Sequence, residues 1–418
     1  MKPKQKSGQS PAGRNEAPEV YAIRRGQSGW TLSRRSLFGA AAAAAAAIPR
    51  HAQAGACATG AVAHFGGICG LAISSDGRLL ASAGSANDLA VHLWSLPNGA
   101  LLRSLTGHAD DVMSVAISPD GGLLASGSRD KTIKLWSLPD GALLKTLTGH
   151  SDMVMSVAIG PDGRLLASGS QDNTIKLWSL PDGALLKTLT ENGGGALSVA
   201  ISPDGQRLAS AGASAVKLWS LPDGALLKTL SGHTGAVDSV AIGPDGRMLV
   251  SGSFDNTIKL WSLPDGALLK TLTGHTAWVL SAAIGPGGRL LASGGWDNTV
   301  RLWSLPDGTL LKTLTGHTNS VFAVAISPDG RLLASGSFDD TIKLWSLPDG
   351  KLLPVCLMDP ASSTPSVSGS TYTMNGVSYA VPCGTPLPAG AVCTCNCVPG
   401  CSCVSYSSGG GGHYWYPN

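Results

Sequence analysis

The fold is decided by a 42-residue unit, GHADDVMSVAISPDGGLLASGSRDKTIKLWSLPDGALLKTLT, at positions 107–148. Seven versions of this unit fill most of the 418-residue chain, and each carries the segment Leu-Trp-Ser-Leu-Pro-(Asp/Asn)-Gly. The tryptophans of this segment recur every 42 residues, with one interval of 41: Trp94, Trp136, Trp178, Trp219, Trp261, Trp303 and Trp345. A fixed period of this length indicates a repeat architecture, in which each unit buries its apolar surface against its neighbours.

Each unit reads as four short strands. Runs rich in Val, Ile, Leu and Thr occupy 112–117, 123–128, 132–138 and 143–147, and turn residues separate them. The turn Pro139-Asp140-Gly141 suits a tight reversal, because Pro presets φ and Gly accepts a positive φ. Four strands in such a short unit leave no room for a helical crossover, so each unit is predicted to form one antiparallel meander. The fold class is therefore all-β.

The repeats resemble WD40 repeats from residue 64 to about residue 357. The resemblance rests on the Trp at a fixed distance after Gly-His pairs at 107–108, 149–150, 232–233, 274–275 and 316–317. It implies a seven-bladed β-propeller, with four-stranded blades around a central channel, over residues 55–358. We expect the last blade to be closed by residues 352–357 as its outer strand, with residues 57–63 packed alongside.

The resemblance also implies a buried tetrad of His, Ser, Asp and Trp in each blade. The matching residues of blades 2, 3, 5, 6 and 7 are His108, Ser126, Asp130 and Trp136; His150, Ser168, Asp172 and Trp178; His233, Ser251, Asp255 and Trp261; His275, Ser293, Asp297 and Trp303; and His317, Ser335, Asp339 and Trp345. Blade 1 fits more loosely, with His64, Ser82, Asp88 and Trp94, since its turn is two residues longer. In blade 4, Glu191-Asn192 replaces Gly-His and the Asp is deleted, so we expect a partly satisfied network and the weakest blade.

Nothing in the repeats indicates catalysis. Glutamate occurs only as Glu16, Glu19 and Glu191, and most aspartates belong to turns or tetrads. The recurring His, Ser and Asp are interpreted as structural, because a catalytic constellation would not be repeated in six blades. The chain is 14% charged with a net charge of +3, which indicates no nucleic-acid partner. We therefore predict a protein that is not an enzyme and needs no cofactor.

The informative positions are those that differ between repeats. The resemblance implies that three positions per blade face one rim of the ring, and three of the five phenylalanines occupy them. The apolar residues at these positions are Phe254, Trp278, Leu280, Trp296, Phe322, Phe338, Met113, Met153 and Met155. Such a patch favours a protein or peptide partner of unknown identity. Two alternatives are that the chain's own tail covers it, or that the repeats have drifted without a partner.

The N-terminal segment, residues 1–54, resembles a twin-arginine export signal. Arg34 and Arg35 precede an alanine-rich run, and Ala52-Gln53-Ala54 suits cleavage after Ala54. The apolar stretch, about 12 residues, is too short to span a bilayer. The expected product is a bacterial protein exported to the periplasm or medium, without a transmembrane anchor.

The C-terminal segment follows a Pro/Ser/Thr-rich linker at 359–371. Residues 372–418 are predicted to form a small module that begins with a hairpin around Asn375-Gly376. Its six cysteines are Cys383, Cys393, Cys395, Cys397, Cys401 and Cys403. They would form disulfides or hold Zn or Cu through thiolates. Metal binding by these cysteines would give an alternative function: a metal-handling protein that acts through the tail, with the propeller presenting it.

Overall fold

The computed structural model describes residues 64, 66–86, 88–97, 99–191 and 193–353, together with several short strands outside these ranges. The chain divides into two units, residues 1–51 and 52–418. The first contains the paired strands β1 (Arg25–Gly26) and β2 (Gly29–Trp30). In the second, β32 (Thr371–Met374) pairs with β33 (Val377–Ala380) and β34 (Val392–Thr394). Met374 lies opposite Val377, as the predicted hairpin requires.

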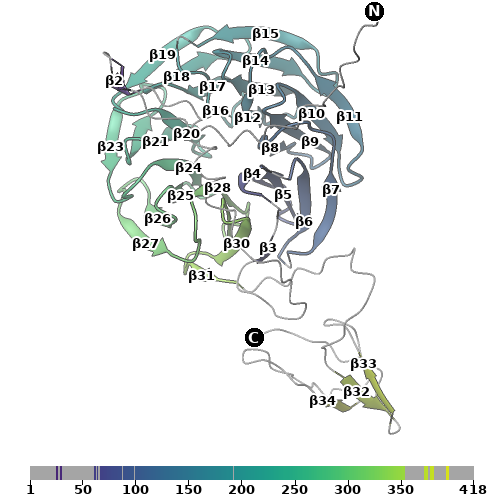
Figure 1. Ribbon diagram of the computed structural model, residues 1–418. Helices are drawn as coiled ribbons and strands as arrows, with labels where there is room; N and C mark the ends of the chain where they lie inside the picture. Colours follow the sequence, from purple (N-terminus) through teal and green to yellow (C-terminus); the bar gives the residue numbers. More distant parts are fainter. Residues whose placement is uncertain are drawn as a thin grey trace, which may run out of the picture. The chain divides into compact units, whose positions relative to one another are not determined.

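Seven antiparallel sheets make up the propeller, and each sheet is one blade. Figure 1 shows them arranged around a common axis, with the first strand of every blade innermost. The strands of blades 1 to 3 are β4 (Ile68–Ile73), β5 (Leu79–Gly84), β6 (Val91–Ser95), β7 (Leu101–Leu105); β8 (Val112–Ile117), β9 (Leu123–Ser128), β10 (Ile133–Ser137), β11 (Leu143–Leu147); and β12 (Val154–Ile159), β13 (Leu165–Ser170), β14 (Thr174–Ser179), β15 (Leu185–Thr190).

The remaining blades follow the same order. Their strands are β16 (Ser198–Ile201), β17 (Arg207–Ala211), β18 (Ala215–Ser220), β19 (Leu226–Ser231); β20 (Val237–Ile242), β21 (Met248–Ser253), β22 (Ile258–Ser262), β23 (Leu268–Leu272); β24 (Val279–Ile284), β25 (Leu290–Gly295), β26 (Val300–Ser304), β27 (Leu310–Leu314); and β28 (Val321–Ile326), β29 (Leu332–Ser337), β30 (Thr341–Ser346), β31 (Lys351–Leu352). The predicted all-β, seven-bladed architecture is confirmed. The described residues contain no helix that is long and apolar enough to span a membrane.

The hydrophobic core lies between blades rather than at the centre of the ring. One apolar cluster fills each of the seven blade interfaces. Between blades 2 and 3, for example, Ile133 and Leu135 pack against Val154, Leu166 and Trp178. Each sheet therefore buries both faces only when its neighbours are present, which explains why the repeats form a closed ring.

Two hydrogen bonds join most neighbouring blades. The hydroxyl of Ser114 on β8 accepts the backbone N–H of Val157 on β12 at 3.1 Å. The equivalent serines of blades 3 to 6 accept from the next blade in the same way: Ser156, Ser198, Ser239 and Ser281. On the outer strand, Lys145 donates to the carbonyl oxygen of Asp182, and Lys187, Lys228, Lys270 and Lys312 repeat this contact.

Both ends of the propeller segment close the ring. Trp345 of β30 pairs with Leu352 of β31, whereas Ile342 of the same strand pairs with Ala61 of β3 (Ala61–Val62). Residues 352–357 are expected to form the outer strand with residues 57–63 packed alongside, whereas residues 61–62 pair directly with β30 and share that role with residues 351–352. Residue 354 is a proline, which has no backbone N–H to donate. The outer strand of blade 7 is accordingly built from two pieces.

The interface between blades 7 and 1, here called the closing seam, lacks the serine bond. The position of Ser114 is occupied by Ala323 in blade 7, which has no hydroxyl to offer to blade 1. The interface between blades 1 and 2 also lacks the serine bond, because Gly70 occupies the serine position in blade 1. A Cβ on Gly70 would lie 3.1 Å from the Cα of Ser114. Other hydrogen bonds join blade 1 to blade 2: Ser75 Oγ donates to the carbonyl oxygen of Pro119, the backbone N–H of Ala86 to Asp111, and Arg103 to the carbonyl oxygen of Pro139.

Candidate functional site

The structure brings the side chains of each tetrad together. In blade 2, the indole N–H of Trp136 donates to Ser126 Oγ at 2.9 Å, and Ser126 Oγ lies 2.8 Å from His108 Nε2. His108 Nδ1 lies 2.8 Å from Asp130 Oδ2. The same contacts occur in blades 1, 3, 5, 6 and 7. Ser126 is 0% exposed, so no substrate reaches its hydroxyl, and the tetrad serves to join the inner strands of the blade.

Hydrogen bonding and burial fix the charge states of these groups. Burial alone would raise the pKa of the Asp339 carboxyl, but hydrogen bonds from His317 and Thr341 outweigh it and lower the pKa to about 2. Burial lowers the pKa of His150 below its ordinary value of 6.5, against the opposing effect of Asp172. At neutral pH the His150 imidazole is therefore neutral and the Asp339 carboxyl is ionised.

Acid should destabilise the propeller in two stages. A histidine whose folded pKa is lowered contributes stability above pH 6.5, and this contribution is lost as the pH falls below that value. The depressed Asp339 carboxyl adds stability that is lost between its ordinary pKa of 3.8 and about 2. We expect the melting temperature, followed by circular dichroism, to fall from pH 6.5 downwards and again below pH 4. A constant melting temperature from pH 7 to pH 5 would contradict the buried neutral histidines.

Blade 4 builds its network from different groups. Glu191 takes the place of the histidine, and the hydroxyl of Ser210 donates to its Oε1. The second oxygen, Oε2, lies 2.7 Å from the ammonium nitrogen of Lys217, and Trp219 donates to Ser210 at 2.9 Å. The expectation of a partly satisfied network is therefore wrong. The deletion of the turn Asp is offset because Glu191 supplies a carboxylate and Lys217 neutralises it.

Five rim side chains form one continuous stack, here called the aromatic arc. The ring of Phe254 stacks on Trp278 at a centroid distance of 4.3 Å, and Trp278 lies 5.4 Å from Trp296. Trp296 lies 5.9 Å from Phe322, which lies 4.2 Å from Phe338. The arc therefore crosses blades 5, 6 and 7 without a break. All five side chains are half-buried.

Backbone hydrogen bonds place these rings at one end of the strands. Trp296, in the turn after β25, donates its backbone N–H to the carbonyl of Trp278, which directly precedes β24. The same bond joins Phe338 to Ser320 in blade 7. At the end of the arc, a Cβ on Gly67 of blade 1 would lie 2.8 Å from the Phe338 ring, so the ring packs directly on that glycine.

Four of the predicted rim residues are too buried to contact a partner. Leu280, Met113, Met153 and Met155 are 4%, 5%, 6% and 3% exposed. They lie on or just before the innermost strands, which pack against one another around the axis, so neighbouring blades cover them. The prediction that the apolar rim extends across blades 2 to 4, where it includes Leu197, is therefore wrong, because Leu197 is also only 7% exposed. Within the described part of the rim, the accessible aromatic side chains are confined to blades 5 to 7.

Among the residues whose burial is described, the most exposed large apolar side chains lie elsewhere, on the outer strands. This outer belt consists of Leu102, Leu143, Leu144, Leu185, Leu186, Leu226, Leu227, Leu268, Leu269, Leu310 and Leu311. Sequence reasoning missed it because a simple alternation would bury one leucine of each pair. A β-bulge opposite Trp136 places both Leu143 and Leu144 in solvent. Because equivalent leucines occur in six blades, the outer belt does not mark one particular blade as a binding site.

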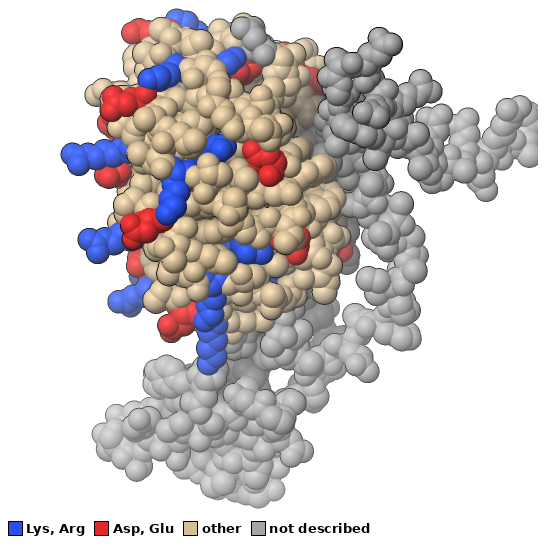
Figure 2. Space-filling model, turned by 90° about the vertical axis from the view of Figure 1, so that its left-hand side faces the viewer, with Lys and Arg blue, Asp and Glu red and all other residues tan. Residues whose placement is uncertain are grey.

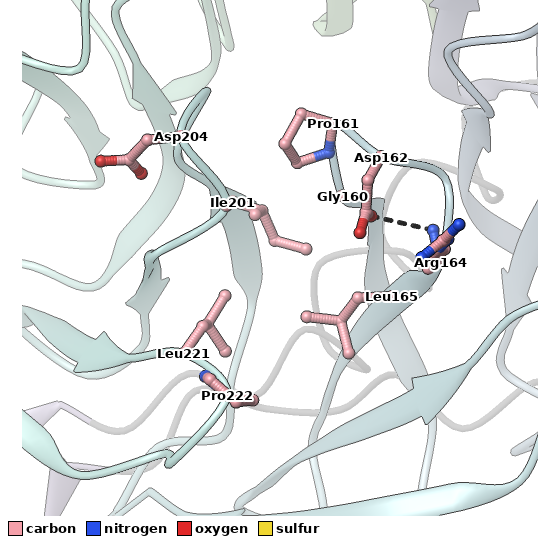
Figure 3. Close-up of a pocket in the computed structure, with 10 residues that line it drawn as sticks. Gly160, Pro161, Asp162, Arg164, Leu165, Ile201, Asp204, Leu221 and Pro222 are labelled. Atoms are coloured by element: carbon pink, nitrogen blue, oxygen red, sulfur yellow. Dashed lines mark hydrogen bonds between the residues drawn. The ribbon is translucent and has the colours of Figure 1, made fainter.

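A cavity of about 390 Å³ lies between blades 3 and 4 (Figure 3). It is lined by turn residues such as Pro161, Asp162 and Arg164, with Asp204 and Pro222 from the next blade. These residues belong to turns that recur in the other repeats, at the opposite end of the strands from the arc. The cavity therefore shows no chemistry of its own. Figure 2 shows acidic and basic side chains intermixed on one side of the propeller, without a patch of a single sign.

The remaining predicted site residues cannot be placed. Arg34, Arg35 and Ala54 lie outside the described residues, as do Cys383, Cys395, Cys397, Cys401 and Cys403. Cys393 belongs to β34, opposite Tyr372 of β32, and only its backbone is described. The choice between disulfides and a metal in the tail stays a prediction.

Comparison with known families agrees with this geometry. The WD domain, G-beta repeat family matches residues 57–95, 99–137, 141–179, 183–220, 224–262, 266–304 and 308–346. The chain is a WD40-repeat protein. The seven matched segments cover well over half of its length, and each ends just after the tetrad tryptophan of one blade.

The WD40 protein is similar to several curated proteins over short segments. It is 45% identical over 62 residues to a periodic tryptophan protein 2 homolog of Neurospora crassa, and 52% identical over 63 residues to WD repeat-containing protein SL1-17 of Schistosoma mansoni. It is 41% identical over 63 residues to protein groucho of Drosophila melanogaster. Each match covers 15% of this chain and 7%, 20% and 8% of the respective relative. The likeness therefore concerns the repeats, not the relatives as whole proteins.

These relatives also correct the predicted localisation. Periodic tryptophan protein 2 and its homologs are matched in Neurospora crassa, Schizosaccharomyces pombe, Saccharomyces cerevisiae and Mus musculus, all of them eukaryotes. The expectation of a bacterial, exported protein is therefore wrong. Its basis was a pair of arginines before an alanine-rich run, a short pattern that basic, alanine-rich segments also contain.

Proposed function

We propose that this WD40 protein is a non-enzymatic scaffold that binds a segment of a partner protein across the aromatic arc. The observation that supports this proposal is the unbroken stack from Phe254 to Phe338 over three blades. Blades 2 and 3 carry no aromatic residue at the equivalent positions, so the repeat itself does not require the rings.

The chemistry of the arc favours a polypeptide partner. Aromatic side chains offer a large contact area with few rotatable bonds, and protein interfaces are enriched in them. The rings already stack on one another in the free protein, so binding them costs little side-chain entropy. WD40 propellers generally bind protein partners, and the arc gives this one a surface that only blades 5 to 7 provide.

Selection of peptides from a random library tests the proposal, because it requires no identified partner. Peptides selected on the wild-type protein should bind the Trp296→Ala variant roughly 30-fold more weakly, a loss of about 2 kcal/mol. The matched control is Leu186→Ala, which removes an outer-belt side chain that is 58% exposed. This control should leave the affinity unchanged.

The reverse pattern would reject the proposal. Peptides that tolerate Trp296→Ala but lose affinity on Leu186→Ala would assign binding to the outer belt. Circular dichroism of both variants must show the wild-type spectrum, so that lost affinity is not mistaken for unfolding.

A further inference from the structure

Blade 1 differs from the other blades at one position of its third strand. The residue two places before the tetrad tryptophan is a cation in the other six blades: Lys134, Lys176, Lys217, Lys259, Arg301 and Lys343. In blade 1 it is His92, on β6. Lys134 donates to the hydroxyl of Thr146 and offers no lone pair, whereas an imidazole has one to give.

This substitution produces a cluster of three potential metal ligands. Asp88 Oδ2 lies 2.8 Å from His64 Nδ1 and 2.9 Å from His92 Nε2. The two imidazole rings meet edge to face, with their centroids 4.4 Å apart. One ligand atom from each residue lies within 4.8 Å of the others, and no second cluster of this kind occurs among the described residues.

We propose that His64, Asp88 and His92 bind a divalent transition-metal ion, with Zn²⁺ as the best match to two imidazoles and one carboxylate. At metal–ligand distances of about 2.0–2.1 Å, tetrahedral geometry separates neighbouring donor atoms by roughly 3.3 Å. The three side chains would therefore move apart by about half an ångström. Three protein ligands leave a fourth position for water.

Each imidazole has a serine hydroxyl at its second ring nitrogen, and this hydroxyl can form a hydrogen bond to the ring whether or not a metal ion is bound. His64 Nε2 lies 2.7 Å from Ser82 Oγ, and His92 Nδ1 lies 2.8 Å from Ser104 Oγ. Without an ion, each ring donates to Asp88 and accepts from its serine. With an ion, each ring stays neutral, carries its proton on the other nitrogen and donates to the same serine.

The two imidazoles differ in how far solvent reaches them. The side chain of His92 is 12% exposed, against 0% for His64, so an ion would enter from the His92 side.

The ion would act at the closing seam. His64 follows β3, the strand that completes blade 7, and its backbone N–H donates to the carbonyl oxygen of Asp340 in blade 7 at 3.4 Å. Asp88 and His92 belong to blade 1. Metal binding would therefore tie the closing segment to blade 1, at the interface where Ala323 removes the serine bond.

The test compares the full-length protein with its His92→Lys variant, after both have been freed of metal with a chelator. The variant restores the side chain of the other blades, and Ser104 can accept from it as Thr146 accepts from Lys134. We expect the wild type to bind one more equivalent of Zn²⁺ than the variant, and its melting temperature to rise more on Zn²⁺ addition. Because both proteins contain the cysteines of the tail, thiolate binding cancels in this difference.

Two outcomes would overturn the proposal. Equal Zn²⁺ stoichiometry and equal thermal shifts in the two proteins would show that His92 is not a ligand. Imidazole nitrogen resonances give a check that needs no variant. On Zn²⁺ addition those of His64 and His92 should shift, while those of the tetrad histidines His108 and His150 should not. Unchanged resonances of His64 and His92 would likewise reject the site.

Discussion

Replacing Trp261 with alanine is expected to reduce the free energy of unfolding by about 3–5 kcal/mol. The indole is 2% exposed and belongs to the cluster between blades 4 and 5, where it packs with Leu218 and Val240. Its N–H donates to the fully buried Ser251 at 2.8 Å. The substitution leaves a cavity in one interface and removes one donor from the tetrad. Urea denaturation measures the loss.

Trp296→Ala is the matched control for this prediction. Its ring is half-buried and contacts Trp278 and Phe322 within the aromatic arc. Because each of these two aromatic pairs contributes about 0.5–1.5 kcal/mol, we expect a loss of about 1–3 kcal/mol, smaller than that of Trp261→Ala. Equal losses in the two variants would show that the arc is part of the core and would remove the basis for a docking surface.

Replacing Lys217 with methionine should cost about 3 kcal/mol, because it leaves the Glu191 carboxylate buried without its partner. Glu191 is 5% exposed, and the two charged groups lie 2.7 Å apart. The ammonium group also lies 5.8 Å from the centroid of the Trp219 ring. Lys217→Met should therefore reduce the free energy of unfolding, even though methionine is an apolar residue that suits a buried position.

Lys134→Met, at the equivalent position of blade 2, is the control. Lys134 donates to the hydroxyl of Thr146 at 2.9 Å, so its loss should cost about 1 kcal/mol. Adding Glu191→Gln to Lys217→Met should recover at least about 1 kcal/mol, since it removes the stranded charge. Equal costs for the two lysine variants, with no recovery in the double variant, would contradict the Glu191–Lys217 pair.

The sequence is sufficient to predict the fold, because the period, the turn residues and the marker tryptophans repeat seven times. It is less reliable wherever one copy departs from the others. From the sequence, Glu191 is interpreted only as the loss of a histidine. Two signals point to an ion pair: Glu191 is the only glutamate in the propeller, and blade 4, like five other blades, has a cation two residues before its tryptophan. The pairing of Glu191 with Lys217 depends on the distance between two strands, which a comparison of repeats does not give.

Part of the candidate site is likewise predictable from the sequence and part of it is not. The repeat pattern assigns the five aromatic residues to one rim, and the structure brings their rings together. The same rule assigns Met113 and Met155 to the rim, but the crowding of inner strands around the axis buries them. The outer belt escapes prediction because it depends on a bulge. His92 reads only as a strand residue, because its contact with Asp88, four residues earlier, depends on how the lengthened turn of blade 1 folds.

The central claim is that the aromatic arc is where a partner docks. Hydroxyl-radical footprinting of the protein, alone and with a saturating selected peptide, tests it directly, because Trp, Phe and Leu are all oxidised when exposed. We expect the peptide to protect Trp278, Trp296 and Phe322, while the oxidation of Leu144 and Leu227 in the outer belt stays unchanged. Protection of the belt leucines with no change at Trp278 and Trp296 would contradict the claim.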